Sequence, residues 1–184
     1  MIGDPGDAQA ICWDEMLVAP PQGSELRWYC FHTRPRREKK VIRFCLRQDV
    51  RCYLPLRRSV KHYGGWQCEH AAPYFPGYVF GCVSPVDCYE LLCAGDIANV
   101  LKVYDQEELL RDLREIEKAL RVSPELEMFP YIKRGRRVKV TRGPFRGVEG
   151  IVSERRKRFR VALNINFIQR ALSIELDCGD VEAV

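Results

Sequence analysis

RVKVTRGPFRGVEGIV, residues 137–152, is the stretch of sequence that decides the fold of the C-terminal part of the chain. Two valines at its start alternate with charged residues, as in a strand that buries one face. The Gly-Pro pair at 143–144 predicts a turn. The glycines at 147 and 150 mark positions that need a positive φ or a close approach of two backbones. The stretch therefore predicts short, sharply bent strands.

The residues that follow extend this pattern. Apolar side chains alternate with polar ones at Phe159, Val161, Leu163, Ile165 and Phe167. Ile174 and Leu176 continue it after a short interruption. Four or five short strands within about fifty residues predict a small β-barrel over residues 133–184, with the alternating residues inside it. In that register Ile168 points outward, beside Gln169 and Arg170.

Upstream, the order of the expected elements predicts an α+β domain over residues 25–121, in which helices pack on a mostly antiparallel sheet. Thr33 and Pro35 are typical of a helix start. The sequence predicts strands at 27–33, 51–56, 78–80 and 97–103, a hairpin over 57–69 that turns at Gly64-Gly65, and helices at 35–48, 85–94 and 106–121. Residues 122–132 contain Ser-Pro and Phe-Pro and show no periodicity, so they predict a linker.

Charge is unevenly distributed along the chain. The formal net charge is +5, yet residues 1–26 hold five acidic and no basic residues. Residues 1–24 therefore predict an acidic, disordered tail, with a short helical turn near 11–17. Residues 131–184 carry 13 basic and 6 acidic residues. A basic body indicates a polyanionic partner such as nucleic acid, although charge that serves solubility alone is the competing interpretation.

The helix expected after the first strand is the most basic element. Between Arg34 and Arg47 there are seven basic residues and one acid, Glu38. A helix that is merely solvated usually mixes both signs, so we expect contacts with phosphates. The candidate nucleic-acid-binding residues are Arg34, Arg36, Lys40, Arg43 and Arg47.

Several classes of protein are disfavoured. No apolar run approaches the ~20 residues of a membrane span, and no secretory signal is recognisable at the N-terminus. The nine cysteines are odd in number and include no Cys-x-x-Cys pair. A disulfide framework would require secretion, of which the sequence shows no sign, so we expect reduced thiols in the cytoplasm. His62, Cys68 and His70 lack the four spaced ligands of a zinc site. No catalytic triad or phosphate-binding loop occurs, so we expect a binding protein with no enzymatic activity, cofactor or metal. We expect it to be a monomer.

Two motifs in this order resemble the NusG family of transcription elongation factors. The first is Trp28-Tyr29 followed by Phe75-Pro76-Gly77-Tyr78-Val79-Phe80, and the second, residues 137–152, resembles a KOW motif. The ending Arg170-Ala-Leu-Ser-Ile-Glu-Leu-Asp177 is also similar to the last strand of that family's KOW domain. The resemblance covers about residues 25–184 and implies a NusG-like N-terminal domain, a linker and an SH3-like KOW barrel.

The resemblance implies a factor that binds the clamp helices of the largest RNA polymerase subunit and reaches the gate loop. It would thereby bridge the DNA cleft beside the transcription bubble and act in elongation, antitermination or termination. The residues that match the polymerase contacts are Trp28, Tyr29, His32, Phe75, Tyr78, Phe80 and, at the gate loop, Tyr89. Within this set we expect Tyr78 and Phe80 to be exposed and Trp28 to lie in the core.

The KOW domain of the family recruits a second partner, either Rho or a small-subunit ribosomal protein. The matching residues are Phe145, Phe167, Ile168 and Arg170. Gln169 stands where many members have Gly, which favours the ribosomal protein over Rho and suggests a specialised paralogue similar to RfaH. A ribosome-associated or RNA-binding KOW protein is the alternative.

Overall fold

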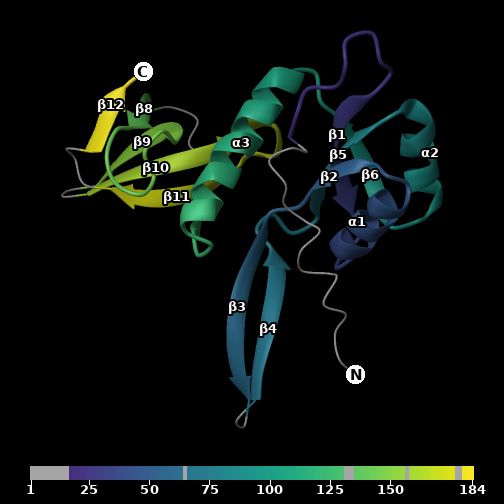
Figure 1. Ribbon diagram of the computed structural model, residues 1–184, viewed down its shortest axis with the longest axis horizontal. Helices are drawn as coiled ribbons and strands as arrows, with labels where there is room; N and C mark the ends of the chain where they lie inside the picture. The colour runs from purple at the N-terminus through teal and green to yellow at the C-terminus, as the bar shows by residue number, and fades with distance from the viewer. Residues whose placement is uncertain (1–16, 64–65, 131–134, 156–157, 177–179) are drawn as a thin grey trace. The chain divides into compact units, whose positions relative to one another are not determined.

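The computed structural model describes residues 17–63, 66–130, 135–155, 158–176 and 180–184 (Figure 1). By their contacts the residues divide into two compact units, 1–106 and 107–184, and each unit is described by itself. Helices and antiparallel sheets are both present, in agreement with the predicted α+β class. Within the described ranges, no helix combines the length and the apolar character needed to cross a bilayer.

The first unit is built on a four-stranded antiparallel sheet with the strand order β2-β5-β1-β6. Its strands are β1 (Arg27–Thr33), β2 (Arg51–Tyr53), β5 (Tyr78–Val83) and β6 (Ile97–Lys102). Helices α1 (Glu38–Arg47) and α2 (Pro85–Cys93) pack on one face, where their apolar residues join the sheet in a single buried cluster. That cluster contains Phe31 and Val79 of the sheet, Ile42 of α1 and Leu91 of α2.

Helix α1 begins later than the sequence predicted. Thr33 does not cap the helix but ends β1, where its N–H donates to the carbonyl of Gly77 at 2.8 Å. The next residues form a turn in which the N–H of Arg37 donates to the carbonyl of Arg34 at 3.1 Å. Arg36 has a φ of 62°, a left-handed conformation that a right-handed helix does not contain. The expected helix over 35–48 is therefore wrong at its start.

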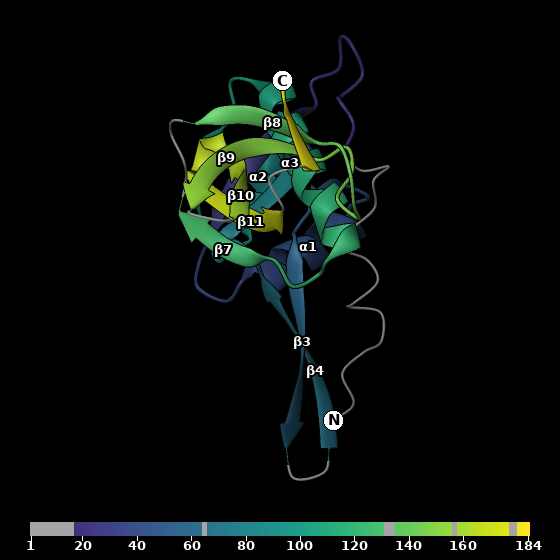
Figure 2. The ribbon, with the colours of Figure 1, turned by 90° about the vertical axis from the view of Figure 1, so that its left-hand side faces the viewer.

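The predicted hairpin is confirmed. Strands β3 (Leu56–Tyr63) and β4 (Trp66–Pro73) pair along their whole length, from Leu56 opposite Pro73 to Tyr63 opposite Trp66. Figures 1 and 2 show this pair as a long twisted arm that leaves the four-stranded sheet of the same unit. The expected turn at Gly64-Gly65 lies outside the described residues.

The segment before β1 is partly fixed in place. Leu17 is buried, and the indole N–H of Trp28 donates to the carbonyl of Val18 at 3.0 Å. The prediction of a disordered tail over residues 1–24 is therefore wrong for Leu17 and Val18. Residues 1–16, which include most of the expected helical turn, lie outside the described residues.

The second unit consists of a helix and a six-stranded antiparallel sheet with the order β12-β8-β9-β10-β11-β7. Its elements are α3 (Gln106–Val122), β7 (Glu127–Pro130), β8 (Arg136–Val140), β9 (Glu149–Arg155), β10 (Arg158–Ile165), the 3₁₀ helix η3 (Asn166–Ile168), β11 (Arg170–Leu176) and β12 (Val181–Ala183). We call these six strands the C-terminal sheet. The first residue of α3, Gln106, belongs to the first unit, where its side chain bonds the N–H and the carbonyl of Trp28.

Part of the predicted linker is regular structure. Residues 127–130 form β7, which pairs with β11 so that Glu127 faces Ser173 and Pro130 faces Arg170. The linker expected over 122–132 is therefore wrong for this segment, and α3 itself extends to Val122. Four residues are too few to show a period of two, and the Phe-Pro pair argued against a strand. Proline is nevertheless tolerated here because β7 is an edge strand of the sheet. Residues 131 and 132 lie outside the described residues.

The glycines that the sequence singled out have the predicted roles. Gly143 and Gly147 have φ of 78° and 89°, in the left-handed region that favours glycine. Gly150 instead allows two strands to approach closely, since a Cβ there would lie 2.5 Å from Val161 Cγ1 and 2.7 Å from the carbonyl oxygen of Ala162. These positions let short strands bend and pack closely.

Candidate functional site

Trp28 and His32 of β1 share one face of the first unit's sheet with Tyr78 and Phe80 of β5. The register of β1 and β5 sets Trp28 opposite Cys82, Cys30 opposite Phe80 and His32 opposite Tyr78. Residues directly opposite one another in an antiparallel pair share a face, so these side chains form one surface. The residues that alternate with them, such as Phe31 and Val79, belong to the buried cluster under α1 and α2. The surface therefore lies on the face that these helices do not cover.

Exposure on this face changes along the strands. Trp28, Cys30 and Phe80 are buried, whereas His32 is exposed and Tyr78 is half-buried. The rings of His32 and Tyr78 lie 5.3 Å apart with an interplanar angle of 32°. Among the described residues of this face, the accessible aromatic surface is therefore this pair, which we call the His32–Tyr78 edge.

The structure corrects the prediction for Phe80 and confirms that for Trp28. Phe80 has no exposed surface, although it shares the face of Tyr78. It lies in the middle of the sheet, between Cys30 of β1 and Tyr53 of β2. Strand alternation determined its face correctly, but its depth follows from the neighbouring strands, which a period of two does not reveal.

The other predicted polymerase residues lie apart from the His32–Tyr78 edge. Phe75 is buried, and Tyr29 is half-buried against the helix-covered cluster, with its ring 6.2 Å from that of Phe31. Tyr89 is 70% exposed on α2, where Val86 is exposed as well. Since α2 packs on the opposite face of the sheet, Tyr89 and the edge form separate surfaces.

The turn that precedes Tyr78 is held by a residue that the sequence did not single out for this role. Gly77 has a φ of 86°, and its N–H donates to Oε1 of Glu38 at 2.8 Å. The carbonyl of Gly77 accepts the N–H of Thr33, and the N–H of Tyr78 donates to the carbonyl of Phe75. Glu38 is buried in the first turn of α1. The Glu38 carboxylate thus connects α1 to the turn of residues 75–78, which we call the aromatic turn. In the sequence, Glu38 stood out only as the single acid among seven basic residues.

The predicted nucleic-acid-binding residues all lie on the surface of α1 or in the turn before it. Arg34, Arg36, Lys40, Arg43 and Arg47 are exposed. Lys40 differs from the rest because its Nζ forms an ion pair with Asp96 at 3.0 Å. Within the described residues, Arg36, Arg43 and Arg47 show no ion pair. The available positive charge therefore lies on these arginines more than on Lys40.

Asp96 also approaches the guanidinium of Arg37, with 3.8 Å between Nε and Oδ1. The backbone of Asp96 takes part as well, since its carbonyl accepts the N–H of Arg34 at 2.9 Å. Asp96 thus holds the turn and the first part of α1 beside the start of β6. These contacts orient α1, and the Asp96 carboxylate neutralises part of the positive charge of Arg37 and Lys40.

The predicted partner loop of the C-terminal sheet has a different register from the expected one. Residues Asn166–Ile168 form η3, and Gln169 follows with a left-handed φ of 51°. This turn interrupts the strand alternation, so Ile168 is buried and Phe167 is exposed. The expectation that Phe167 fills the core and Ile168 points outward is therefore wrong. Arg170 is exposed and Phe145 is half-buried.

The cysteines that the structure describes are free thiols: Cys30, Cys45, Cys52, Cys82, Cys88 and Cys93. The first four are buried. Burial raises the pKa of Cys30 to about 12. A hydrogen bond with Cys52, together with burial, raises the pKa of Cys45. Protonated, buried thiols pack as small apolar groups and are poor nucleophiles. The side chains of His62, Cys68 and His70 lie outside the description, so the zinc hypothesis is not tested there.

Comparison with known proteins gives one family match. The family model described as Transcription termination factor nusG matches residues 26–130. That range contains β1 to β6, and it continues through α3 and β7 of the second unit. No curated protein matches the chain.

Proposed function

The chain belongs to the NusG family of transcription factors, and we propose that it binds RNA polymerase through the His32–Tyr78 edge. The observation that carries this proposal is the edge itself: an accessible aromatic pair at a strand end, beside a turn that Glu38 holds in place. Partly exposed aromatic residues in a preformed setting are typical anchors of protein interfaces. The clamp helices of the largest polymerase subunit are the proposed contact, with Tyr89 directed at the gate loop.

The proposal includes a role for α1. Arg36, Arg43 and Arg47 would contact the backbone phosphates of DNA in the transcription bubble while the polymerase holds the protein. Glu38 supports this arrangement, because it bonds the aromatic turn from the first turn of the same helix. Such a factor acts by binding, with no catalytic step.

We further propose that the C-terminal sheet is a KOW domain that recruits a second partner. Phe167 and Arg170 are exposed at the loop after β10 and form the proposed contact, while buried Ile168 supports the loop from inside. A small-subunit ribosomal protein is favoured over Rho, because Gln169 adds bulk at this loop. Regulation of elongation, in the manner of a specialised paralogue similar to RfaH, is the proposed outcome.

Tyr78→Ala is expected to weaken binding of the full chain to purified core RNA polymerase about thirtyfold. Removing one anchoring aromatic side chain from an interface costs about 2 kcal/mol. Tyr104→Ala is the matched control, since Tyr104 is 88% exposed in the same unit and lies outside the edge. Binding is measured by titration of labelled protein, with circular dichroism to show that both variants are folded. Undiminished binding by folded Tyr78→Ala, or capture by ribosomes in place of polymerase, would refute the assignment.

Arg43→Ala is expected to lower the log–log salt slope of binding to single-stranded or bubble DNA by about 0.7 to 0.9. Lys40→Ala should lower it less, because Asp96 already neutralises part of that charge. Lys102→Ala, at an exposed position in β6, is the control and should leave the slope unchanged. Equal slopes for all three variants would show that α1 is an ordinary solvated helix.

A further inference from the structure

Helix α3 presents three carboxylates to the C-terminal sheet. Glu108, Asp112 and Glu115 are spaced by four and three residues, so they lie along one side of the helix. We call these residues the carboxylate row. Each accepts a hydrogen bond from an N–H group of Glu149 or Asn166. A set of acids that an exposed helix would turn toward water is here turned toward the sheet.

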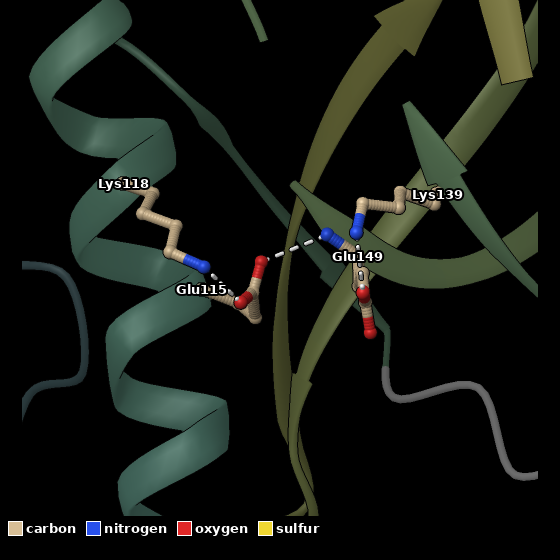
Figure 3. Close-up of polar contacts among 4 residues, drawn as sticks. All are labelled: Glu115, Lys118, Lys139 and Glu149. Atoms are coloured by element: carbon tan, nitrogen blue, oxygen red, sulfur yellow. Dashed lines mark hydrogen bonds and ion pairs between the residues drawn. The ribbon is translucent and has the colours of Figure 1, made fainter. Parts of the chain in front are cut away.

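The contact at Glu115 is shown in Figure 3. The backbone N–H of Glu149, at the start of β9, donates to Oε2 of Glu115 at 2.8 Å. Oε1 of the same carboxylate pairs with Lys118 at 2.6 Å, and the Glu149 side chain pairs with Lys139 at 3.4 Å. Each of the two carboxylates therefore has its own lysine, which lowers the repulsion between them.

The other two carboxylates hold a single residue, Asn166. Its backbone N–H donates to Oδ2 of Asp112 at 3.0 Å, and its side-chain Nδ2 donates to Oε1 of Glu108 at 2.8 Å. Asn166 is the first residue of η3. Two bonds to one helix fix both its backbone and its side chain, and thereby the point at which the loop leaves β10.

We propose that the carboxylate row is a positioning device for the loop of residues 166–170, which sets the direction in which Phe167 and Arg170 face a partner. Docking of α3 on the C-terminal sheet follows from its hydrogen bonds with Glu149 and Asn166. The effect of this docking on recruitment of a partner rests on the proposed function of the C-terminal sheet. Arg137 of β8 lies near the carboxylate row. It lines a cavity of about 40 Å³ together with Arg111, Asp112 and Asn164.

Asp112 makes this device sensitive to pH. The groups around it are Glu108 and Arg111 on its own helix, Arg137 of β8 and Asn166 of the loop. Glu115 and Glu149 line the same cavity. Burial, assisted by the charge of Glu108, raises the pKa of Asp112 from 3.8 to about 7, against the lowering effects of the Asn166 N–H and the two arginines.

The direction of the pH effect follows from this shift. In the docked state α3 contacts the C-terminal sheet, and in an open state this contact is lost and Asp112 has its ordinary pKa. Because the pKa of Asp112 is raised in the docked state, the carboxyl group binds its proton more tightly there than in the open state. Docking is therefore strongest below about pH 4, weakens as the pH rises toward about 7, and changes little above that value. The neutral carboxyl still has a carbonyl oxygen that accepts the Asn166 N–H.

Amide hydrogen exchange of the full chain tests the proposal. The protection factor of the Asn166 amide is expected to fall by up to about tenfold per pH unit between pH 5 and 7, and then to level off. Asp112→Ala should lower this protection at least tenfold at pH 5, while the amide of Val161 in β10 is unaffected. Asp112→Asn keeps an acceptor without a charge, so it should restore the protection and abolish the pH dependence. Glu107→Ala, an exposed acid on the same helix, should behave as the wild type.

The same variants separate this proposal from the proposed function. Unchanged protection of Asn166 in Asp112→Ala, or an unchanged pH slope in Asp112→Asn, would overturn the positioning role. Binding of the isolated small-subunit ribosomal protein should fall in Asp112→Ala and recover in Asp112→Asn. Wild-type protein that fails to bind this partner would contradict the recruitment proposal and leave the exchange result standing.

Discussion

Ile168→Asp is expected to destabilise the C-terminal unit by about 4 kcal/mol or more. Ile168 is only 8% exposed, and its burial depends on the 3₁₀ turn that Asn166 begins. Replacing a buried Ile by a small residue typically costs about 2 to 5 kcal/mol, and an unpaired carboxylate in its place adds a desolvation cost. Small domains have a total stability of about 5 to 15 kcal/mol, so this change would remove a large part of the stability of the unit.

The measurement is urea-dependent hydrogen exchange of the amides in β10 and β11. These amides report on the C-terminal unit. Tryptophan fluorescence would not, because all three tryptophans lie at or before residue 66. Phe167→Asp is the matched control: the adjacent residue is 36% exposed, so the change should cost no more than about 1 kcal/mol. Greater damage from Phe167→Asp than from Ile168→Asp would restore the uninterrupted strand register and contradict the structure.

This pair of residues shows where sequence periodicity stops being informative. Val161, Leu163 and Ile165 are buried, as the alternation predicted. Ala162 and Asn164 between them are buried too, so this part of β10 has no exposed face. Extending the same alternation to Phe167 failed because η3 advances the chain by a helical turn instead of a strand step. Neither Asn166 nor Gln169 is a residue that demands such a turn, so the interruption had no clear local signal.

The N-terminal unit shows the same difference between elements and their ends. The strand at 27–33 and the helix ending near residue 47 follow from aromatic content and from the spacing of apolar residues. The start of α1 does not, because Thr33 and Pro35 resemble a helix cap. What decides it is tertiary: Thr33 bonds Gly77 and Arg34 bonds Asp96, so the chain remains extended past Thr33 before it turns.

Residues that act through long-range hydrogen bonds were the least predictable part of the candidate site. The bond from the Gly77 N–H to Glu38 spans 39 residues, and those from Asn166 to Asp112 and Glu108 span 54 and 58. Acidic residues are common in both helices, so no spacing rule separates the ones that accept a buried N–H from those that face water. The aromatic residues were predicted only in part: Tyr78 and Phe80 share a face, as their spacing of two requires, but Tyr29 lies on the opposite face and Phe80 is buried.

Gly150→Ala is expected to destabilise the C-terminal unit by about 3 kcal/mol or more, although it adds a single methyl group. The new Cβ would lie 2.5 Å from Val161 Cγ1, 2.7 Å from the carbonyl oxygen of Ala162 and 3.1 Å from a methyl group of Leu163. Overpacking in a core typically costs about 1 to 3 kcal/mol, and more where the clashing atom cannot move aside. Here one of the clashing atoms is backbone in β10, which pairs with β9 on one side and β11 on the other.

Gly147→Ala separates steric overlap from backbone strain. Gly147 has a φ of 89°, and a Cβ added there would meet no neighbouring atom within 4 Å. Alanine at this position therefore meets only the cost of the left-handed conformation, about 1 to 2 kcal/mol. Both variants are compared by the same urea-dependent exchange of β10 and β11 amides. A Gly147→Ala variant that is less stable than Gly150→Ala would mean that β9 and β10 can separate at little cost. The close approach at Gly150 would then not be what holds this part of the C-terminal sheet together.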